Sequence, residues 1–392
     1  MLPHKSLFAV ASNDPTELGL QLAAAAKEHP IYFDEGMGIP VVLRTDDISR
    51  VLRDENTFST RPFAMGLMKD ALIAAQGDDH TQMRKLYTQF FSPQKIRQYE
   101  QDIVTPAVAL VLDELENRPQ PDLLDHFCMQ VPQQVISALF GLPAERIAEN
   151  DVLVRTMFHA IVKPFDEEAA AEGHKAYDTM SEELHQIAAR ELESPSNTLL
   201  GEIARALQEG GDATVEACER IVFTLILGSY ETTIWGLASV MAGLLRYPET
   251  MARVRDDLTL LPKTIEEAWR WCGSSMGTIR YVEEDTELGG VPLSTGTVVH
   301  LAFMAPHFEA ETYPEPGTFD IDRTAHTMIF GGGVHYCIGA PLARMESRVA
   351  IGELLTRFPA LRADPDRDPP MFAPGTRGSI AFGPDHLPVL LR

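Results

Sequence analysis

Residues 330–344 read Phe330-Gly331-Gly332-Gly333-Val334-His335-Tyr336-Cys337-Ile338-Gly339-Ala340-Pro341-Leu342-Ala343-Arg344. Cys337 lies among glycines, and because glycine has no Cβ the backbone here is able to approach a flat ligand closely and direct N–H groups at the sulfur. Pro341 suits the first turn of a helix, whose positive dipole end favours a thiolate at Cys337. The stretch predicts an axial thiolate ligand for haem iron, with a buried structural cysteine beside a glycine-rich turn as the alternative.

The composition excludes several classes of protein. The chain has 392 residues, 45 % hydrophobic and 23 % charged, which is typical of a globular protein. Its 33 basic and 57 acidic residues give a net charge of −24, which disfavours binding to nucleic acid or anionic membranes. The four cysteines form no CxxC pair, so neither a zinc site nor a disulfide framework is predicted. Because the first residues lack the pattern of a signal peptide, we expect a cytoplasmic protein.

The longest apolar stretch runs from Ile221 to Leu245 and contains one charged residue, Glu231. It is long enough to cross a membrane. However, Glu231 lies at its centre among hydroxyl residues, and an ionised side chain at the middle of a bilayer costs about 3 kcal/mol or more. We therefore expect a long helix buried in a protein core.

Helical periodicity dominates the first 270 residues. The expected helices cover residues 15–28, 81–90, 94–116, 130–140, 167–193 and 199–209, besides the long apolar helix. Short β-like segments are expected at residues 31–33, 41–43, 279–282 and 298–303, the first two as a hairpin. Residues 283–322 are rich in glycine and proline and are expected to be mostly turns. No linker divides the chain, so we expect one domain.

The pattern Phe330-Gly331-x-Gly333-x-His335-x-Cys337-x-Gly339 resembles the haem-binding signature of the cytochrome P-450 family at every fixed position. Three further motifs lie earlier in the chain, in the order and at the spacing that the family would require, so the resemblance spans most of the chain. It implies a mainly α, single cytochrome P-450-type helical fold over residues 1–392, with a small β-rich part near residues 30–60 and 279–325. Haem b would be buried between the long central helix and the cysteine-loop helix, with Cys337 as axial ligand of its iron.

The segment Gly228-Ser229-Tyr230-Glu231-Thr232-Thr233 resembles the family's oxygen-activating stretch. The resemblance makes Glu231 the acid and Thr232 the hydroxyl that deliver protons to iron-bound dioxygen. Back-bonded hydroxyls and one satisfied carboxyl are the alternative. Ser229 departs from the family, which usually has glycine there, so a narrower or differently hydrated groove is expected beside the haem.

Two sets of charged residues complete the resemblance. Glu267 and Arg270 form an ExxR motif on one helix face, and with Arg323 they match the family's buried structural triad; a solvated surface pair is the alternative. The residues expected to contact the haem are Cys337, His80, Arg84, Arg280, His335, Phe330, Gly331 and Gly339. Among these, the two histidines and two arginines match the family's donors to the haem propionates.

The resemblance implies a haem-thiolate monooxygenase that inserts one oxygen atom of dioxygen into a small-to-medium apolar substrate, by hydroxylation or oxidative O-dealkylation. A haem-thiolate peroxygenase or isomerase, or a haem-based sensor, is the alternative. The positions that match the family's substrate pocket are Leu72, Ile73, Leu227, Gly228, Met276 and Thr278. Residues 158–169 are expected to form a mobile lid.

Because little chain follows the cysteine segment, electrons are expected from a separate ferredoxin-type donor, with NAD(P)H acting only through redox partners. Basic residues around the thiolate side would steer that acidic donor; they are Lys85, Lys95, Arg97, Arg344 and Arg348. Scattered solvated bases are the alternative. We expect a monomer without a membrane anchor.

Overall fold

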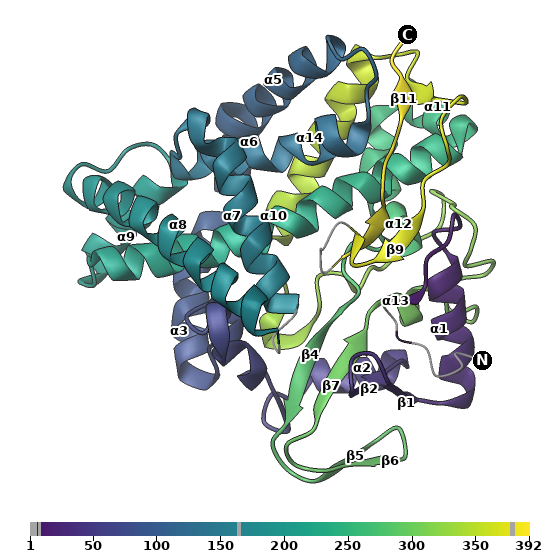
Figure 1. The fold of residues 1–392 in the computed structure, drawn as a ribbon, viewed down its shortest axis with the longest axis horizontal. Helices are drawn as coiled ribbons and strands as arrows, with labels where there is room; N and C mark the ends of the chain where they lie inside the picture. Colours follow the sequence, from purple (N-terminus) through teal and green to yellow (C-terminus); the bar gives the residue numbers. More distant parts are fainter. Residues whose placement is uncertain (1–5, 7–8, 163–165, 377–380) are drawn as a thin grey trace.

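The computed structural model describes residues 6, 9–162, 166–376 and 381–392. Helices fill most of the left side of Figure 1, most strands lie in its lower part, and the yellow C-terminal strands lie at its upper right. The α-helices are α1 (Glu17–Glu28), α2 (Thr45–Arg53), α3 (Gly77–Thr88), α4 (Pro93–Tyr99), α5 (Thr105–Glu116), α6 (Gln130–Phe140), α7 (Ile147–Val162), α8 (Glu167–Glu193), α9 (Leu199–Gly210), α10 (Val215–Arg246), α11 (Pro248–Asp256), α12 (Leu261–Trp271), α13 (Met304–His307) and α14 (Ala340–Arg357).

The strands are β1 (Ile31–Asp34), β2 (Ile39–Val42), β3 (Phe58–Ser59), β4 (Gly277–Val282), β5 (Thr286–Leu288), β6 (Val291–Leu293), β7 (Val298–Ala302), β8 (Arg362–Ala363), β9 (Phe372–Pro374), β10 (Phe382–Pro384) and β11 (Val389–Leu390). Five of them form one sheet in the order β1-β2-β7-β4-β3, and the others form three two-stranded sheets. The expected mainly α fold with a small β-rich part is confirmed.

The long apolar stretch is the core helix α10. The Thr214 side chain caps its N-terminus by accepting a hydrogen bond from the Ala217 N–H. The helix is long and apolar enough to cross a membrane, but 78 % of its most hydrophobic window is buried inside the protein. It packs against α6, α8, α9, α12 and α14. Burial among other helices accounts for its apolar character.

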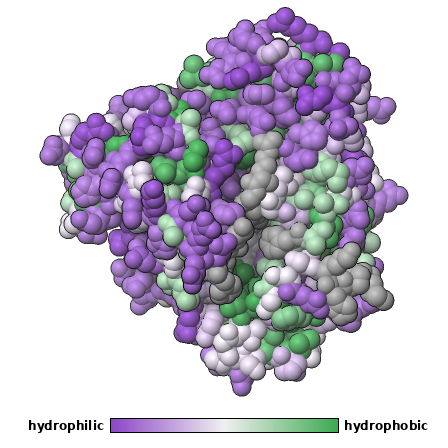
Figure 2. Space-filling view, viewed as in Figure 1, coloured by the Kyte–Doolittle hydropathy of each residue, from purple (hydrophilic) through white to green (hydrophobic). Residues whose placement is uncertain are grey.

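The expected N-terminal hairpin is present as β1 and β2, which pair antiparallel. The Asp34 carboxylate accepts hydrogen bonds from the N–H groups of Gly36 and Met37 at distances of 2.9 and 2.8 Å, which fixes the turn. Strand β7 then pairs parallel with β2 and antiparallel with β4. Hydrophobic residues gather on the lower, β-rich side of the face drawn in Figure 2, whereas the helical side is mostly hydrophilic.

Several sequence expectations need correction. The helix expected over residues 94–116 is interrupted by a π-helical segment, Glu100–Val104, between α4 and α5. Residues 283–322 are not only turns, because they contain the hairpin β5–β6 and the whole of β7. In the expected lid over residues 158–169, Phe158 is buried in α7 and Ala169 in α8, and residues 163–165 lie outside the described residues.

The ExxR motif ties α12 to the segment that leads into the cysteine loop. The Arg270 Nε lies 2.7 Å from Glu267 Oε2, and the Arg323 Nε lies 3.2 Å from Glu267 Oε1. Arg270 also donates hydrogen bonds to the carbonyl oxygens of residues 307, 316 and 318. Glu267 and Arg270 are fully buried, and a buried pair broken by loss of one partner typically costs about 3–5 kcal/mol. The three side chains therefore lie together where they brace this irregular segment.

Candidate active site

The cysteine loop is shaped by glycine and by backbone hydrogen bonds. The Cys337 N–H donates to the Phe330 carbonyl at 2.9 Å, which closes the loop. Gly333 has a φ of +63°, and a Cβ added there would lie 1.9 Å from the Leu52 carbonyl oxygen. Only glycine fits this position without moving the backbone of Leu52. The loop thus holds the cysteine immediately before α14.

The Cys337 sulfur accepts hydrogen bonds from the N–H groups of Gly339 and Ala340, as expected for a sulfur at a helix N-terminus. These bonds and the charges of Arg84 and Arg344 lower the pKa of the Cys337 thiol, but burial raises it by more. The helix N-terminus therefore favours the thiolate, as expected, but burial opposes it. Coordination to a metal ion deprotonates a thiol outright, so bound haem iron would stabilise the Cys337 thiolate that burial disfavours.

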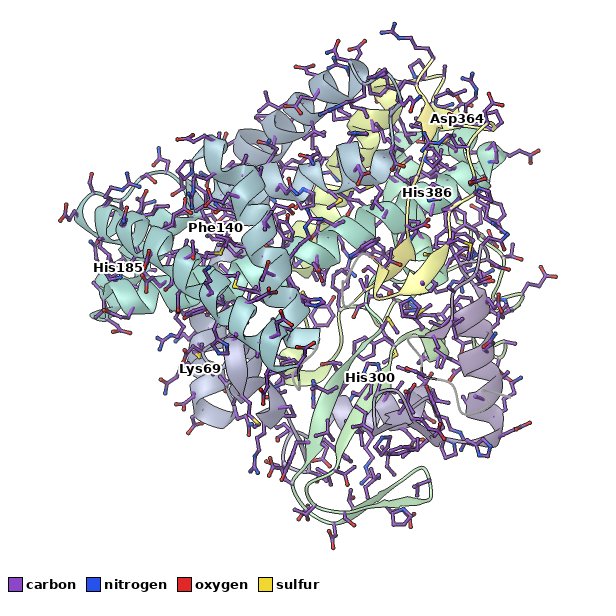
Figure 3. The ribbon with its side chains drawn as sticks, in the orientation of Figure 1. Lys69, Phe140, His185, His300, Asp364 and His386 are labelled. Carbon is purple, nitrogen blue, oxygen red and sulfur yellow. The ribbon has the colours of Figure 1, made fainter. Side chains whose placement is uncertain are left out.

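A large cavity opens in front of Cys337, with about 1410 Å³ of empty space including its part open to solvent. Its walls come from α3, α6, α10, α12, α14 and the loops around Leu72 and Phe330. Phe140 of α6, seen among the helices in Figure 3, is one of its apolar lining residues. The cavity lies between α10 and the start of α14, where the sequence places the haem.

One face of α10 lines this cavity, with residues at the i, i+4 spacing of a single helix face: Leu225, Gly228, Ser229, Thr232, Thr233 and Gly236. The Thr232 hydroxyl donates to the Gly228 carbonyl at 3.0 Å, and the Ser229 hydroxyl donates to the Leu225 carbonyl at 2.7 Å. Glu231 is buried next to this face and does not itself line the cavity. The hydroxyl and the carboxyl of the predicted pair therefore lie at different depths.

The predicted substrate positions divide into two groups. Leu72, Ile73 and Gly228 line the cavity, whereas Leu227, Met276 and Thr278 do not. Leu227 is rotated about 100° from Gly228 around α10 and packs into the core instead. Met276 is likewise a buried core residue. The Thr278 hydroxyl accepts a hydrogen bond from Arg280 at 3.2 Å.

The four predicted propionate donors come from three separate segments. The rings of His80 and His335 are 4.3 Å apart, and both residues line the cavity together with Arg84. Burial and the positive charges of Arg280 and Arg84 lower the pKa of His335 to about 3. Burial lowers the pKa of Arg280 to about 10. Within the described residues no salt bridge neutralises Arg84 or Arg280, whereas His335 is neutral near pH 7.

This cluster provides a test of whether haem fits. The Nε2 atom of His80 is buried and has no hydrogen-bond partner among the described residues. A buried polar atom without a partner is costly, and two arginine side chains without ion pairs favour a bound anion. Two propionates supply acceptors and negative charge at this place, while the Cys337 sulfur faces the same cavity. The residues present therefore fit haem.

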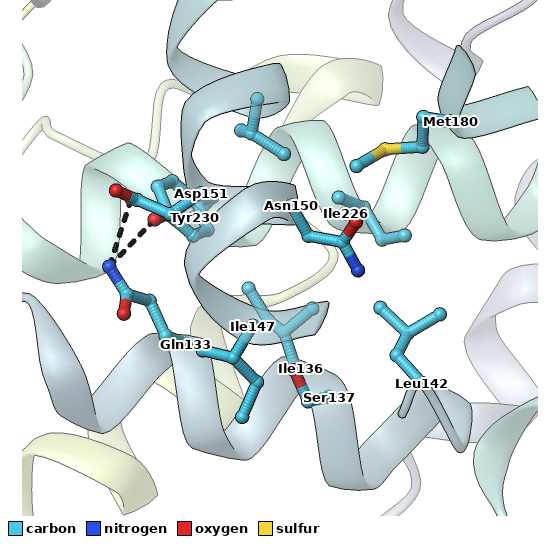
Figure 4. A pocket seen from close by; sticks show the side chains of 11 residues that line it. Gln133, Ile136, Ser137, Leu142, Ile147, Asn150, Asp151, Met180, Ile226 and Tyr230 are labelled. Carbon is cyan, nitrogen blue, oxygen red and sulfur yellow. Dashed lines mark hydrogen bonds between the residues drawn. The ribbon is translucent and has the colours of Figure 1, made fainter. Parts of the chain in front are cut away.

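A second, smaller cavity lies on the other side of α10, with about 270 Å³ of empty space (Figure 4). There the Gln133 amide donates hydrogen bonds to Asp151 and to the Tyr230 hydroxyl, each at 2.9 Å. Tyr230 thus points away from the large cavity and links α10 to α6 and α7. The sequence does not predict this role of Tyr230, because its hydrogen-bond partners are distant along the chain.

The basic residues of the predicted donor surface are largely paired. Lys95 contacts Glu202 at 2.5 Å, Arg344 contacts Glu266 at 2.6 Å and Arg348 contacts Glu100 at 2.5 Å. Lys85 and Arg97 are exposed and form no salt bridge within the described part of the chain. Ion pairs therefore reduce the positive charge that the sequence suggested on this face.

A model of the cytochrome P450 family matches residues 21–389 of the chain. The chain belongs to the cytochrome P450 family. This P450 is 47 % identical over 391 residues to the C-19 steroid 1alpha-hydroxylase of Sorangium cellulosum, and the match covers 99 % of both chains. It is 31 % identical to the 6-deoxyerythronolide B hydroxylase of Saccharopolyspora erythraea over 80 % of this chain and 76 % of that one.

The solved structure of cytochrome P450 260B1 from Sorangium cellulosum So Ce56 matches with a TM-score of 0.94 and 51 % identity, covering 100 % of each chain. The expected P-450 fold is confirmed. The enzyme is a haem-thiolate monooxygenase that uses haem b and dioxygen, as the family does. Its electrons come from a redox partner.

Proposed function

We propose that this P450 hydroxylates an apolar substrate of steroid size and takes its electrons from a separate ferredoxin-type protein in the cytoplasm. The arrangement of Cys337 and Thr232 around one large, mainly apolar cavity carries the proposal. The 47 % identical relative, a C-19 steroid hydroxylase, supports the steroid class. Within the described lining, the ionisable side chains besides the two histidines, Cys337 and Tyr336 are Arg84 and Glu346, so nothing favours an anionic substrate over a neutral one.

Different residues of this chain would bind the haem and shape the loop around Cys337. Cys337 would hold the haem iron and donate electron density to it, and haem would supply the redox chemistry on dioxygen. His80, Arg84, Arg280 and His335 would hold the propionates. Phe330, Gly331 and Gly339 shape the cradle around the sulfur. The Glu267–Arg270–Arg323 triad braces the approach to that cradle.

Glu231 and Thr232, the acid–threonine pair, would transfer protons within the active site. The Thr232 hydroxyl faces the cavity and donates to the Gly228 carbonyl, so its lone pairs would be able to accept a hydrogen bond from water. Glu231, buried beside it, supplies the proton that Thr232 passes on. A substrate that fills the apolar cavity would displace its water and thereby keep these protons from being lost to other reactions.

Thr232→Ala tests this role. We expect the variant to consume NAD(P)H at a rate similar to the wild type but to release hydrogen peroxide in place of most of the hydroxylated product. Thr156→Ala is the matched control, because Thr156 also donates to the carbonyl four residues before it, on α7 and away from the cavity. An unchanged product yield per reductant in Thr232→Ala would contradict the proposed role.

The substrate class is tested by adding a neutral C19 steroid such as androstenedione to the purified ferric enzyme. We expect a saturable spin shift, because an apolar ligand displaces water from the cavity. A fatty-acid anion of similar apolar area is the comparison, since no basic residue other than the propionate donors lines the cavity. A spin shift with the anion and none with the steroid would overturn the proposed class.

A further inference from the structure

The second cavity, behind α10, is lined by polar groups that still have hydrogen bonds to make. Asn150 of α7 is 7 % exposed and lines this cavity, yet its Oδ1 atom has no hydrogen-bond partner among the described residues. Tyr230 and Ser137 line the same cavity from α10 and α6. The Tyr230 hydroxyl oxygen accepts from the Gln133 amide, so its own O–H is available to donate elsewhere. A buried acceptor and a buried donor at one cavity are groups that an ordered water molecule joins.

Tyr230 belongs to a part of α10 that holds its shape weakly by itself. Gly228 is a poor helix former. The hydroxyls of Ser229 and Thr232 both bond back to carbonyl oxygens four residues earlier, a pattern that weakens and bends helices. Thr232 lies roughly 200° around the helix from Tyr230, so the two side chains point to nearly opposite sides. A tie at Tyr230 therefore sets how far Thr232 is turned toward the large cavity.

This tie reaches two other helices. The Gln133 amide of α6 donates to the Tyr230 hydroxyl and to Asp151 Oδ1, each at 2.9 Å (Figure 4). Asp151 of α7 is also paired with Arg155, one turn later on the same helix. Gln133, Asp151 and Tyr230 are all buried, and hydrogen bonds are stronger where water and its high dielectric constant are excluded. The positions of α6 and α7 are thus linked to the residue directly before Glu231.

We propose that Tyr230 and Gln133 are positioning residues for hydroxylation, and that water bonded between the Tyr230 O–H and Asn150 Oδ1 completes their network. Through this network, α6 and α7 hold the segment around Thr232 at one rotation, from the side of α10 that faces away from the large cavity. Neither positioning residue is among the described residues that line the large cavity, so neither contacts the reacting atoms. The inference rests on the proposed function, because it assigns Tyr230 to the positioning of Thr232.

A crystal structure of the haem-loaded enzyme tests the water site. We expect an ordered water molecule within hydrogen-bond distance of the Tyr230 hydroxyl and of Asn150 Oδ1. In Tyr230→Phe, which keeps the ring but removes the hydroxyl, this water should be lost or displaced. A second cavity without ordered water in the wild-type crystal structure overturns the inference.

The positioning role is tested by comparing ligand affinity with coupling in Tyr230→Phe. We expect an apolar ligand to give the spin shift with unchanged affinity, because the lining of the large cavity is unaltered, while the product formed per NAD(P)H falls several-fold. Tyr99→Phe is the matched control, since Tyr99 is equally buried but its hydroxyl donates to Glu202 of α9. We expect this control to lose stability in chemical denaturation much as Tyr230→Phe does, and to keep its product yield.

Gln133→Met tests the same hydrogen bond from α6, because methionine has a similar shape but cannot donate. If the two residues act as one unit, Gln133→Met should lose as much product per NAD(P)H as Tyr230→Phe, and the double variant no more than either. Should Tyr230→Phe fail to take up haem, Gln133→Met alone decides. Unchanged yield in these variants, additive losses in the double variant, or an equal loss in Tyr99→Phe overturns the inference. Absence of product in every variant, wild type included, contradicts the proposed function instead.

Discussion

At the scale of single residues, the cysteine loop shows how closely sequence and geometry correspond. The motif requires glycine at residue 333, and the structure gives the reason, because the backbone there has a φ of +63° and lies against the Leu52 carbonyl. Leu52 belongs to α2, so this one glycine sets how near the loop comes to a helix from the N-terminal part of the chain. A larger residue would push the sulfur away from the cavity.

We therefore expect Gly333→Ala to lower both the haem content and the unfolding temperature of the purified enzyme. The positive φ alone costs roughly 1–2 kcal/mol for a residue with a Cβ, and the contact at 1.9 Å adds to it. Gly290→Ala is the control, because Gly290 has a φ of +81° but nothing within 4 Å of an added Cβ. Equal haem content and stability in the two variants would contradict the account of the loop.

Sequence reasoning found the residues that spacing defines and missed those that depend on helix rotation. Gly228 lines the cavity and Leu227 does not, because successive residues are rotated by about 100° around α10. Likewise, Lys95 and Glu202 are distant along the chain, so the sequence does not predict the ion pair that they form. Glu346 reads as an ordinary polar position of a helix, and only packing reveals its burial.

At the scale of elements, the short helix α13 connects the buried triad to the cysteine loop. The His307 carbonyl accepts a hydrogen bond from Arg270, and the His307 Nε2 atom accepts one from the Met328 N–H at 2.7 Å. The Met328 carbonyl in turn accepts from the Gly331 N–H at 2.8 Å. A neutral imidazole is thus part of the scaffold, because a protonated His307 has no lone pair to accept the Met328 N–H.

This arrangement predicts a loss of stability in acid. Burial and the charge of Arg270 lower the pKa of His307 to about 3, whereas an unfolded histidine titrates near 6.5. As the pH falls from 6.5 the unfolded chain binds the extra proton first, so the free energy of unfolding decreases by up to about 1.4 kcal/mol per pH unit. His307→Gln, which keeps an acceptor, should show a shallower decrease between pH 6.5 and 5.

Chemical denaturation at several pH values measures this slope. His29→Gln is the control, because His29 is exposed and should leave the slope unchanged. The buried His300, visible on β7 in Figure 3, contributes a similar dependence, since burial lowers its pKa to about 4. The slope is therefore expected to shrink in His307→Gln but not to vanish. An identical slope in the wild type and His307→Gln would exclude this role.

At the scale of the whole molecule, a net charge of −24 must still allow an acidic electron donor to approach. Three of the five basic residues predicted for that surface are ion-paired, which leaves Lys85 and Arg97 as exposed cations without a salt bridge in the described part of the chain. Electrostatic steering depends on such unneutralised charge. Lys85 lies on α3, one residue after Arg84 at the cavity.

We expect Lys85→Glu to slow reduction by a ferredoxin several-fold at low ionic strength and to weaken the dependence of that rate on salt. Lys175→Glu on α8 makes the same charge change at another exposed position and should have a much smaller effect. Stopped-flow reduction at several salt concentrations measures both. Equal rates and equal salt dependence in the two variants would place the donor elsewhere.

The central claim is that Cys337 binds haem iron as a thiolate, and the absorbance difference spectrum of the dithionite-reduced enzyme with and without carbon monoxide tests it most directly. The account predicts the long-wavelength Soret band of a thiolate-ligated carbonyl complex in the wild type and its loss in Cys337→Ala. A wild-type protein that stays colourless when supplied with haemin, or a Cys337→Ala variant that keeps the band, would contradict it.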